Sequence, residues 1–170
     1  MVTDYRAVND TIKPAAIPMP NLEDKASLFA GATAWCTLDM LQGYWQVPLN
    51  EGAHEMFTMV TTEGFFTPRR VPPGVLNATG YFQATMGDVL DGYIDKICLV
   101  CVDDIVIWGE TPEILLKRLL AILDRLLERG LFAAAHKVGF FRKEFKWCEK
   151  ILSGQTVSHD PERTQGLSEL

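Results

Sequence analysis

The sequence predicts an α+β fold in which helices cover one face of an antiparallel sheet. Short runs rich in β-branched and aromatic residues alternate with turn signals, which is typical of strands. Two longer stretches carry apolar residues at helical spacing. With 170 residues, of which 48% are hydrophobic and 22% charged, the chain has the size and composition of one globular domain with its own core.

The amino-terminal part of the chain predicts an extended segment, a short helix and a strand. Residues 1–30 are largely polar, and three prolines favour an extended path there: Pro14, Pro18 and Pro20. The stretch 21–32 predicts a short helix that ends near Gly31. TAWCTLDM at 33–40 then predicts a strand that ends at Asp39.

The middle of the chain predicts a hairpin followed by a helix. Residues 46–50 and 55–71 resemble a hairpin region, with Thr-Thr-Glu-Gly at 61–64 as the turn. A proline-broken loop at 71–74 leads into 76–94, where helical spacing of apolar residues predicts a helix packed on the sheet. These apolar residues are Leu76, Phe82, Met86, Val89 and Leu90.

Residues 111–130 carry the strongest helix signals. Thr111 suits the N-cap, Pro112 the first turn and Gly130 the carboxyl-terminal stop. One apolar stripe is expected to face the sheet: Leu115, Leu119, Ile122 and Leu126. A second row is expected to thicken it, so that the helix is largely buried: Leu116, Leu120, Leu123 and Leu127. LFAAA at 131–135 then predicts a strand, and 141–154 a closing strand pair.

Two adjacent carboxylates, Asp103 and Asp104, interrupt two apolar strands in KICLVCVDDIVIWG at 96–109. Such a pair needs a compensating cation, because like charges repel and each resists desolvation. Mg²⁺ takes oxygen ligands and tolerates close carboxylates. Asp39 can meet the pair at one sheet edge, which is the arrangement for two-metal phosphoryl transfer. The alternative is a plain β-turn, where Asp is common, and spacing alone favours that alternative.

Charge and composition argue against several classes of protein. A net charge of −6 argues against holding nucleic acid through the overall field, because phosphate binding is largely electrostatic. No signal peptide or bilayer-spanning apolar stretch is apparent, so an intracellular protein is expected. Cys98 and Cys101 form a C-x-x-C, but residues three apart on a strand point to opposite faces. Two buried thiols are therefore expected rather than a zinc or redox pair.

Five motifs in order resemble the reverse transcriptases of retroviruses and, most closely, of Gypsy-type LTR retrotransposons. They are TDYRAVNDTIKPAAIPMP at 3–20, TLDMLQGYWQVPL at 37–49, VPPGVLNATGYFQATM at 71–86, CVDDIVIW at 101–108, and HKVGFF with FKWCEKILSG within 136–154. The resemblance implies a polymerase palm with partial fingers and almost no thumb. Fingers parts are expected at about 1–14 and 47–77, palm parts at about 15–46 and 78–157, and the start of the thumb or connection at 158–170.

The resemblance also implies a role for each acid. Asp39 and Asp103 would bind two Mg²⁺ ions, for which Mn²⁺ can substitute, and Asp104 would complete the site. The main chain of Met40 would supply a further oxygen. Tyr44 occupies the position of the family's steric gate, an aromatic ring that excludes a ribose 2′-hydroxyl and so selects deoxynucleotides.

Further positions match residues of the family that meet the nucleotide. Lys137 matches a lysine that protonates the leaving pyrophosphate, and a simple solvated lysine is an equal alternative. Backbone groups of four residues would lie against the triphosphate: Met40, Leu41, Gln42 and Gly43. A loop and the helix behind it would complete the nucleotide site: Pro72, Pro73, Gly74 and Gln83.

The implied activity is RNA-directed DNA polymerisation, in which a primer 3′-hydroxyl attacks the α-phosphate of a deoxynucleoside triphosphate. Expected partners are an RNA or DNA template with its primer, dNTPs, and the polyprotein remainder with thumb, connection and ribonuclease H, but no membrane. The expected location is the cytoplasm or a virus-like particle.

Some residues depart from the family pattern. Pro73 stands where relatives carry Phe or Gln, and Cys148 with Glu149 replaces the apolar-Gly pair of the primer grip. The lysine and arginine of the fingers that clamp the triphosphate are missing, so the chain resembles a fragment. The alternative function is a catalytically silent retroelement relic that acts as a binding or interaction module.

Overall fold

The computed structural model of this chain describes residues 3–16, 18, 22–142, 144–147, 150–153 and 156–159. The sequence-based predictions at Cys148 and Glu149, and most of the expected thumb start, at 160–170, lie outside the described residues. Within the described ranges, no helix combines the length and the apolar character needed to cross a bilayer.

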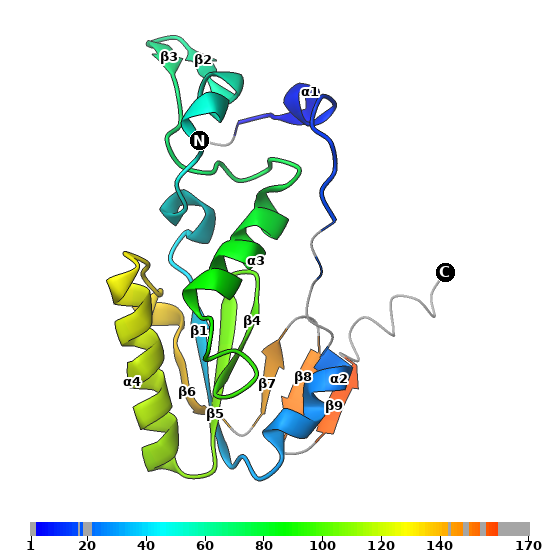
Figure 1. The fold of residues 1–170 in the computed structure, drawn as a ribbon, viewed down its shortest axis with the longest axis vertical. Helices are drawn as coiled ribbons and strands as arrows, with labels where there is room; N and C mark the ends of the chain where they lie inside the picture. Colours follow the sequence, from blue (N-terminus) through cyan, green and yellow to red (C-terminus); the bar gives the residue numbers. More distant parts are fainter. Residues whose placement is uncertain are drawn as a thin grey trace.

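A four-stranded antiparallel sheet in the order β4-β5-β1-β6 lies at the centre of the molecule (Figure 1). Its strands are β1 (Ala34–Asp39), β4 (Cys98–Cys101), β5 (Asp104–Gly109) and β6 (Gly139–Arg142). β1 pairs with β5 along its whole length. β4 and β5 form a hairpin closed by Val102 and Asp103. The predicted strand ending at Asp39 and the hairpin around the acidic pair are both confirmed.

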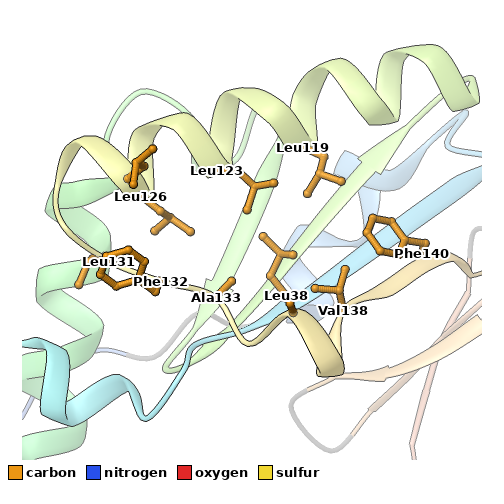
Figure 2. A pocket seen from close by; sticks show the side chains of 11 residues that line it. Leu38, Leu119, Leu123, Leu126, Leu131, Phe132, Ala133, Val138 and Phe140 are labelled. Atoms are coloured by element: carbon orange, nitrogen blue, oxygen red, sulfur yellow. The ribbon is translucent and has the colours of Figure 1, made fainter.

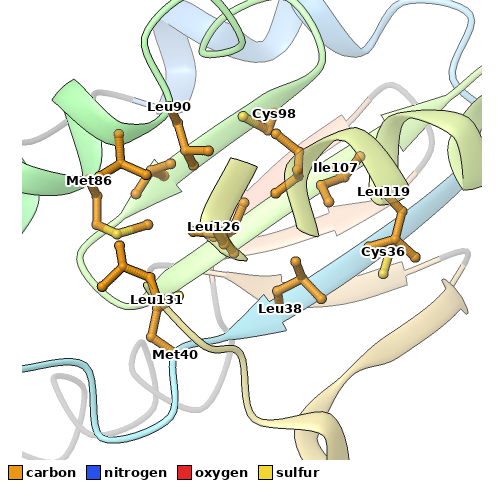
Figure 3. Close-up of a cluster of buried hydrophobic side chains, with 14 of the residues drawn as sticks. Cys36, Leu38, Met40, Met86, Leu90, Cys98, Ile107, Leu119, Leu126 and Leu131 are labelled. Carbon is orange, nitrogen blue, oxygen red and sulfur yellow. The ribbon is translucent and has the colours of Figure 1, made fainter. Parts of the chain in front are cut away.

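Helices α3 (Ala78–Val89) and α4 (Pro112–Glu128) cover the same face of this sheet. Their buried side chains form one core with those of the strands, and Figure 3 shows part of it: Met86, Leu119 and Leu126 over Cys36, Leu38 and Ile107. Burying a side chain of this size contributes roughly 1.5–3 kcal/mol. The predicted α+β class, with helices on one face of an antiparallel sheet, is confirmed.

The two faces of the sheet carry different side chains, because neighbouring residues on a strand point to opposite faces. Cys36, Leu38, Ile105 and Ile107 belong to the core under the helices. A second cluster occupies the other face, and its buried members are Phe29, Trp35, Leu99, Val106 and Trp108. The same alternation directs the last residue of β1 and the first of β5 to this second face.

Helix α4 begins and ends as predicted. The Thr111 hydroxyl oxygen accepts a hydrogen bond from the Ile114 N–H at 3.3 Å, and Gly130 has a φ of +68° just beyond the helix. The first apolar stripe is buried. The second row is instead exposed: Leu116 by 49%, Leu120 by 52%, Leu123 by 36% and Leu127 by 64%. The prediction for this row is wrong, because a helix on one sheet face buries only the stripe that meets the sheet.

An apolar pocket of about 440 Å³ lies between α4 and the segment 131–140 (Figure 2). Hydrophobic side chains line it, among them Leu119, Leu123, Phe132 and Phe140. No charged side chain is among its lining residues.

The predicted strand at 131–135 is wrong. Only Ala133 pairs, as an isolated bridge with Met40, and Ala135–Lys137 form the 3₁₀ helix η5. The backbone here binds the end of β1 instead: Phe132 O accepts the Leu41 N–H at 3.0 Å, and Ala134 N–H donates to Asp39 O at 2.8 Å. These bonds bring η5 beside the last residue of β1.

The remaining elements lie around this centre. The predicted hairpin is confirmed as β2 (Met59–Thr61) and β3 (Gly64–Phe66), far from the sheet of β7, β8 and β9 in Figure 1. The other bounds are α1 (Arg6–Asn9), α2 (Leu22–Lys25), η1 (Ala26–Phe29), η2 (Gly43–Gln46), η3 (Glu51–Ala53), η4 (Glu55–Phe57), β7 (Glu144–Trp147), β8 (Lys150–Ser153) and β9 (Thr156–His159). The predicted closing strand pair is confirmed by β7 and β8.

The two cysteines of the C-x-x-C lie on opposite faces of β4. Cys98 is a free, buried thiol in the core under the helices, and Cys101 packs against the second cluster. Burial raises the pKa of the Cys98 thiol to about 12. Cys101 is disulfide-bonded, so the prediction of a free thiol is wrong for this residue.

Candidate active site

Three acidic residues meet at one end of the sheet. Asp39 ends β1 and Asp104 begins β5, and the two residues are directly opposite each other in the antiparallel ladder. Opposite residues point to the same face, with Cβ atoms roughly 4.5–5.5 Å apart. Asp103 precedes Asp104 in the turn, and its carbonyl oxygen accepts the Met40 N–H at 2.9 Å. Backbone pairing therefore sets where all three residues stand.

The turn that carries Asp103 has an unusual backbone at Val102. Its φ is +56°, a region that β-branched residues seldom adopt. The side-chain amide of Gln83, from α3, binds this turn. Gln83 Oε1 accepts the Val102 N–H at 2.6 Å, and Nε2 donates to Val100 O at 3.3 Å. Both polar atoms of Gln83 are thus directed at the hairpin backbone.

Lys137 pairs with the carboxylate of Asp39. Its Nζ donates to Oδ1 at 2.9 Å and to Oδ2 at 3.0 Å, and the side chains of Lys137 and Asp39 are 53% and 24% exposed. The hydrogen bond to Asp39 raises the pKa of Lys137 above its usual value. The ammonium group therefore neutralises part of the negative charge at this end of the sheet.

Asp104 shows that this negative charge is not fully compensated. Burial and, after it, the negative charges of Asp103 and Asp39 raise the pKa of its carboxyl to about 6, while Lys137 opposes the shift. A cation bound nearby would stabilise the ionised form of a carboxyl that is surrounded by like charges.

The donor atoms suit a hard divalent ion, since carboxylate oxygens are preferred ligands of Mg²⁺. Among the described residues, however, no three His, Cys, Asp or Glu side chains lie close enough together to hold a metal ion as they stand. A shared ion therefore requires the carboxylates to turn toward one another. The structure brings the three acids to one edge without closing them into a ligand set.

A pocket of about 340 Å³ opens beside the acids. It is lined by Asp39, Met40, Gln42, Gly43, Tyr44, Trp45, Pro73, Asp103 and Lys137. Eight of these nine are residues that the sequence predicted for the site. Four more predicted nucleotide contacts are not among the lining residues: Leu41, Pro72, Gly74 and Gln83. Asp104 is not among them either. Trp45 was missed by sequence reasoning, and its place beside Tyr44 in the same motif was the available signal.

Helix α3 supports the wall of this pocket. The Tyr44 ring packs on Phe82 with centroids 5.5 Å apart, and its hydroxyl shares a hydrogen bond with Thr79 Oγ1 at 3.1 Å. Gly43 lies so close to Phe82 that a Cβ at position 43 would stand 2.8 Å from the ring. The sequence contained no local signal for Thr79, because its contact with Tyr44 spans 35 positions.

Backbone amides near the acids are partly engaged. Met40 N–H donates to Asp103 O and Leu41 N–H to Phe132 O. A phosphate contact through either amide would therefore require breaking a hydrogen bond that holds the end of β1.

The sequence profile of one family, described as "Reverse transcriptase (RNA-dependent DNA polymerase)", matches residues 1–148. The chain belongs to this reverse transcriptase family. It is 30% identical, over 169 residues, to the retrovirus-related Pol polyprotein from transposon gypsy of Drosophila melanogaster. The match covers 99% of this chain and 16% of that polyprotein. The resemblance to Gypsy-type elements is thereby confirmed, and the chain spans about one sixth of that relative's length.

Two other comparisons agree. An RNA-directed DNA polymerase homolog of Oenothera berteroana is 36% identical over 108 residues, which cover 64% of this chain and 76% of that protein. The solved structure of a foamy viral protease-reverse transcriptase in complex with double-stranded DNA matches with a TM-score of 0.83 at 24% identity. It covers 100% of this chain and 30% of that one, and shows that the two share a fold.

Proposed function

We propose that this chain is the palm, with part of the fingers, of an RNA-directed DNA polymerase that adds dNTPs to a primer 3′-hydroxyl. One observation carries the proposal. Asp39 and Asp104 face each other across β1 and β5, with Asp103 in the adjoining turn, beside a pocket walled by Gly43 and Tyr44. This chain matches 16% of the gypsy polyprotein. The activity and the partners of the whole protein are therefore proposed here as well.

Asp39, Asp103 and Asp104 are the residues that would hold two Mg²⁺ ions, or Mn²⁺ in their place. Bound there, the ions would stabilise the attacking and leaving oxygens of an in-line phosphoryl transfer. The raised pKa of Asp104 and the Asp39–Lys137 pair support this assignment, because both reflect negative charge that a divalent cation would offset.

The remaining residues of the pocket would bind and select the nucleotide. Tyr44, held by Thr79 and Phe82, presents a fixed ring that would exclude a ribose bearing a 2′-hydroxyl. Gly43 has no side chain, so the backbone of the pocket wall can pack directly against the Phe82 ring. Positioning of this kind supplies much of the catalysis in phosphoryl transfer.

Lys137 is the cationic side chain among the residues that line the pocket. Displaced from Asp39, its ammonium would be free to protonate the leaving pyrophosphate, as a general acid does. While it remains paired with Asp39, the same group keeps the acids partly neutral.

The partners in this proposal are a primer on an RNA or DNA template, dNTPs and the rest of a polyprotein, in the cytoplasm or a virus-like particle. A chain with a net charge of −6 must hold phosphates through local cations, because phosphate contacts dominate nucleic-acid affinity. The thumb, connection and ribonuclease H parts of the polyprotein would supply further contacts.

A primer-extension assay tests the proposal. The full chain is incubated with a labelled primer on an RNA template, dNTPs and Mg²⁺, beside Asp103→Asn and the control Asp124→Asn, which alters an exposed acid on α4. Extension by the unmodified chain and the control, with loss in Asp103→Asn, is expected. Equal extension by all three would contradict the assignment of the acids.

No extension by the unmodified chain, beside an active reference enzyme, would reject a self-sufficient polymerase. Binding of the primer–template in fluorescence anisotropy would then favour the second candidate, a catalytically silent binding module. Pro73 in the pocket wall favours that candidate, because its ring offers the nucleotide no hydrogen-bond donor.

A further inference from the structure

Gln83 connects helix α3 to the hairpin that carries two of the three acids. Its amide makes two hydrogen bonds to backbone atoms on either side of Cys101: Oε1 accepts from Val102 N–H at 2.6 Å, and Nε2 donates to Val100 O at 3.3 Å. Gln83 is half-buried and is not among the residues that line the pocket at the acids. Its polar atoms therefore face the hairpin rather than the place where a nucleotide would bind.

The backbone that Gln83 binds is the strained part of the turn. Val102 has a φ of +56°, and a β-branched residue holds such a conformation only when its surroundings enforce it. Val102 immediately precedes Asp103, so its backbone angles set the direction in which the next residues leave the turn. Releasing Val102 would consequently let Asp103 and Asp104 shift together.

An amide is the side chain that fits both contacts. It offers one acceptor oxygen and one donor nitrogen at the same distance from the helix, whereas Glu accepts only and Met does neither. The ladder between β4 and β5 already pairs Val100 with Ile105 and Cys101 with Asp104. Gln83, on α3, adds a hydrogen bond to Val102, which lies in the turn outside this ladder.

We propose that Gln83 is a positioning residue, which clamps Val102 in its strained conformation and so holds Asp103 and Asp104 in place for the metal ions of the proposed function. The clamp itself follows from the two hydrogen bonds, and its consequence for metal binding rests on the proposed function. Because Thr79 and Phe82 of the same helix hold Tyr44, α3 sets the position of both the acids and the wall of the pocket.

The first measurement is amide hydrogen exchange of Val102 by NMR on the full chain. In the unmodified chain the Val102 amide is expected to be protected. Gln83→Met should speed its exchange by about 3- to 10-fold, the range expected for losing one neutral hydrogen bond. Gln83→Glu, which keeps the acceptor oxygen, should retain most of the protection. The control Thr85→Val, whose lost hydroxyl donates to Tyr81 O in the same helix, should leave Val102 unchanged.

The second measurement is the affinity for Mn²⁺, read from the electron paramagnetic resonance signal of the free ion. Gln83→Met is expected to weaken binding roughly 10- to 100-fold, as loss of a residue that orients metal ligands does, while Thr85→Val has no effect. Unchanged Mn²⁺ affinity in a folded Gln83→Met chain would overturn the positioning role.

Rapid exchange of Val102 in the unmodified chain would overturn the clamp without any variant, so a variant that fails to fold leaves the proposal testable. No Mn²⁺ binding by the unmodified chain would reject both the metal site of the proposed function and the positioning role built on it. In that case protection of the Val102 amide would still support the hydrogen bonds of the clamp. The two measurements therefore distinguish a failure of the metal site from a failure of the clamp.

Discussion

Alanine at three glycines should change the stability of the fold in an order that the structure dictates. A Cβ at Gly109 would lie 2.6 Å from the backbone N of Leu115, and a Cβ at Gly43 would lie 2.8 Å from the Phe82 ring. A Cβ at Gly87 would have nothing within 4 Å. Gly43 and Gly109 are thus sites of close approach, and Gly87 is an open position in the last turn of α3.

The magnitudes follow from what each new methyl group would meet. At Gly43 the ring of Phe82 must move, and it is 1% exposed and enclosed by the core, so overpacking should cost about 1–3 kcal/mol. At Gly109 the obstacle is the first turn of α4, which must shift as a whole, so the cost should reach about 3 kcal/mol or more. Gly87→Ala should instead stabilise by about 0.5–1 kcal/mol, because alanine is the better helix former.

Urea unfolding followed by circular dichroism measures these differences. With a slope of about 2 kcal/mol/M for a domain of this class, Gly43→Ala should lower the midpoint by about 0.5–1.5 M and Gly87→Ala should raise it slightly. Equal midpoints for Gly43→Ala and the unmodified chain would refute the close packing of η2 on α3. Equal losses of stability in Gly43→Ala and Gly87→Ala would show that contact with the Phe82 ring does not cause the loss at position 43.

Three further predictions concern the acids and helix α4. The pKa of the Asp104 carboxyl is raised in the folded chain from 3.8 to about 6, so the fold favours its protonated form. Because solvent screens this half-buried carboxyl, the metal-free chain should lose only about 1–2 kcal/mol of stability as the pH rises from about 4 to above 6. Asp104→Asn should remove that loss, and urea midpoints at pH 4.5 and 7 measure it. A variant that loses the same stability over this range would contradict the origin of the shift. Lys137→Met should bind Mn²⁺ more tightly than the unmodified chain in the same resonance assay, since the ammonium competes for Asp39; weaker binding would show that Lys137 supports the site instead. Thr111→Ala should lower the free energy of unfolding by about 1 kcal/mol, because the Ile114 N–H loses its cap, and an unchanged thermal midpoint would show that the cap contributes nothing.

Several parts of the fold could be predicted from the sequence because their causes are local. Thr111, Pro112 and Gly130 mark the ends of α4 through their own backbone preferences. The apolar strands around Asp103 and Asp104 are short-range patterns of the same kind. The motif that contains Asp39 and Tyr44 is also contiguous, so the family and the principal acids could be inferred from the order of residues alone.

Other features depended on contacts between distant segments. Lys137 reaches Asp39 across 98 positions, because backbone hydrogen bonds of Phe132 and Ala134 to the end of β1 bring η5 beside it. Gln83 binds Val102 across 19 positions, and its role could not be read from its place on α3. The exposed leucines of α4 illustrate the same limit, since apolar character does not say which side of a helix the sheet will cover.

The sequence by itself determined the approximate bounds of most sheet strands and of the two helices that pack on the sheet. It also determined which acids occupy the hairpin turn and the end of β1. Both follow from backbone preferences and hydrophobic spacing, which act over a few residues. The tertiary structure alone decided which face of the sheet those acids share, which cation neutralises Asp39 and which side chain holds the hairpin turn. Such pairings require segments far apart in the chain to meet, and only the packing of α3, α4 and the segment 131–137 on the sheet brings them together.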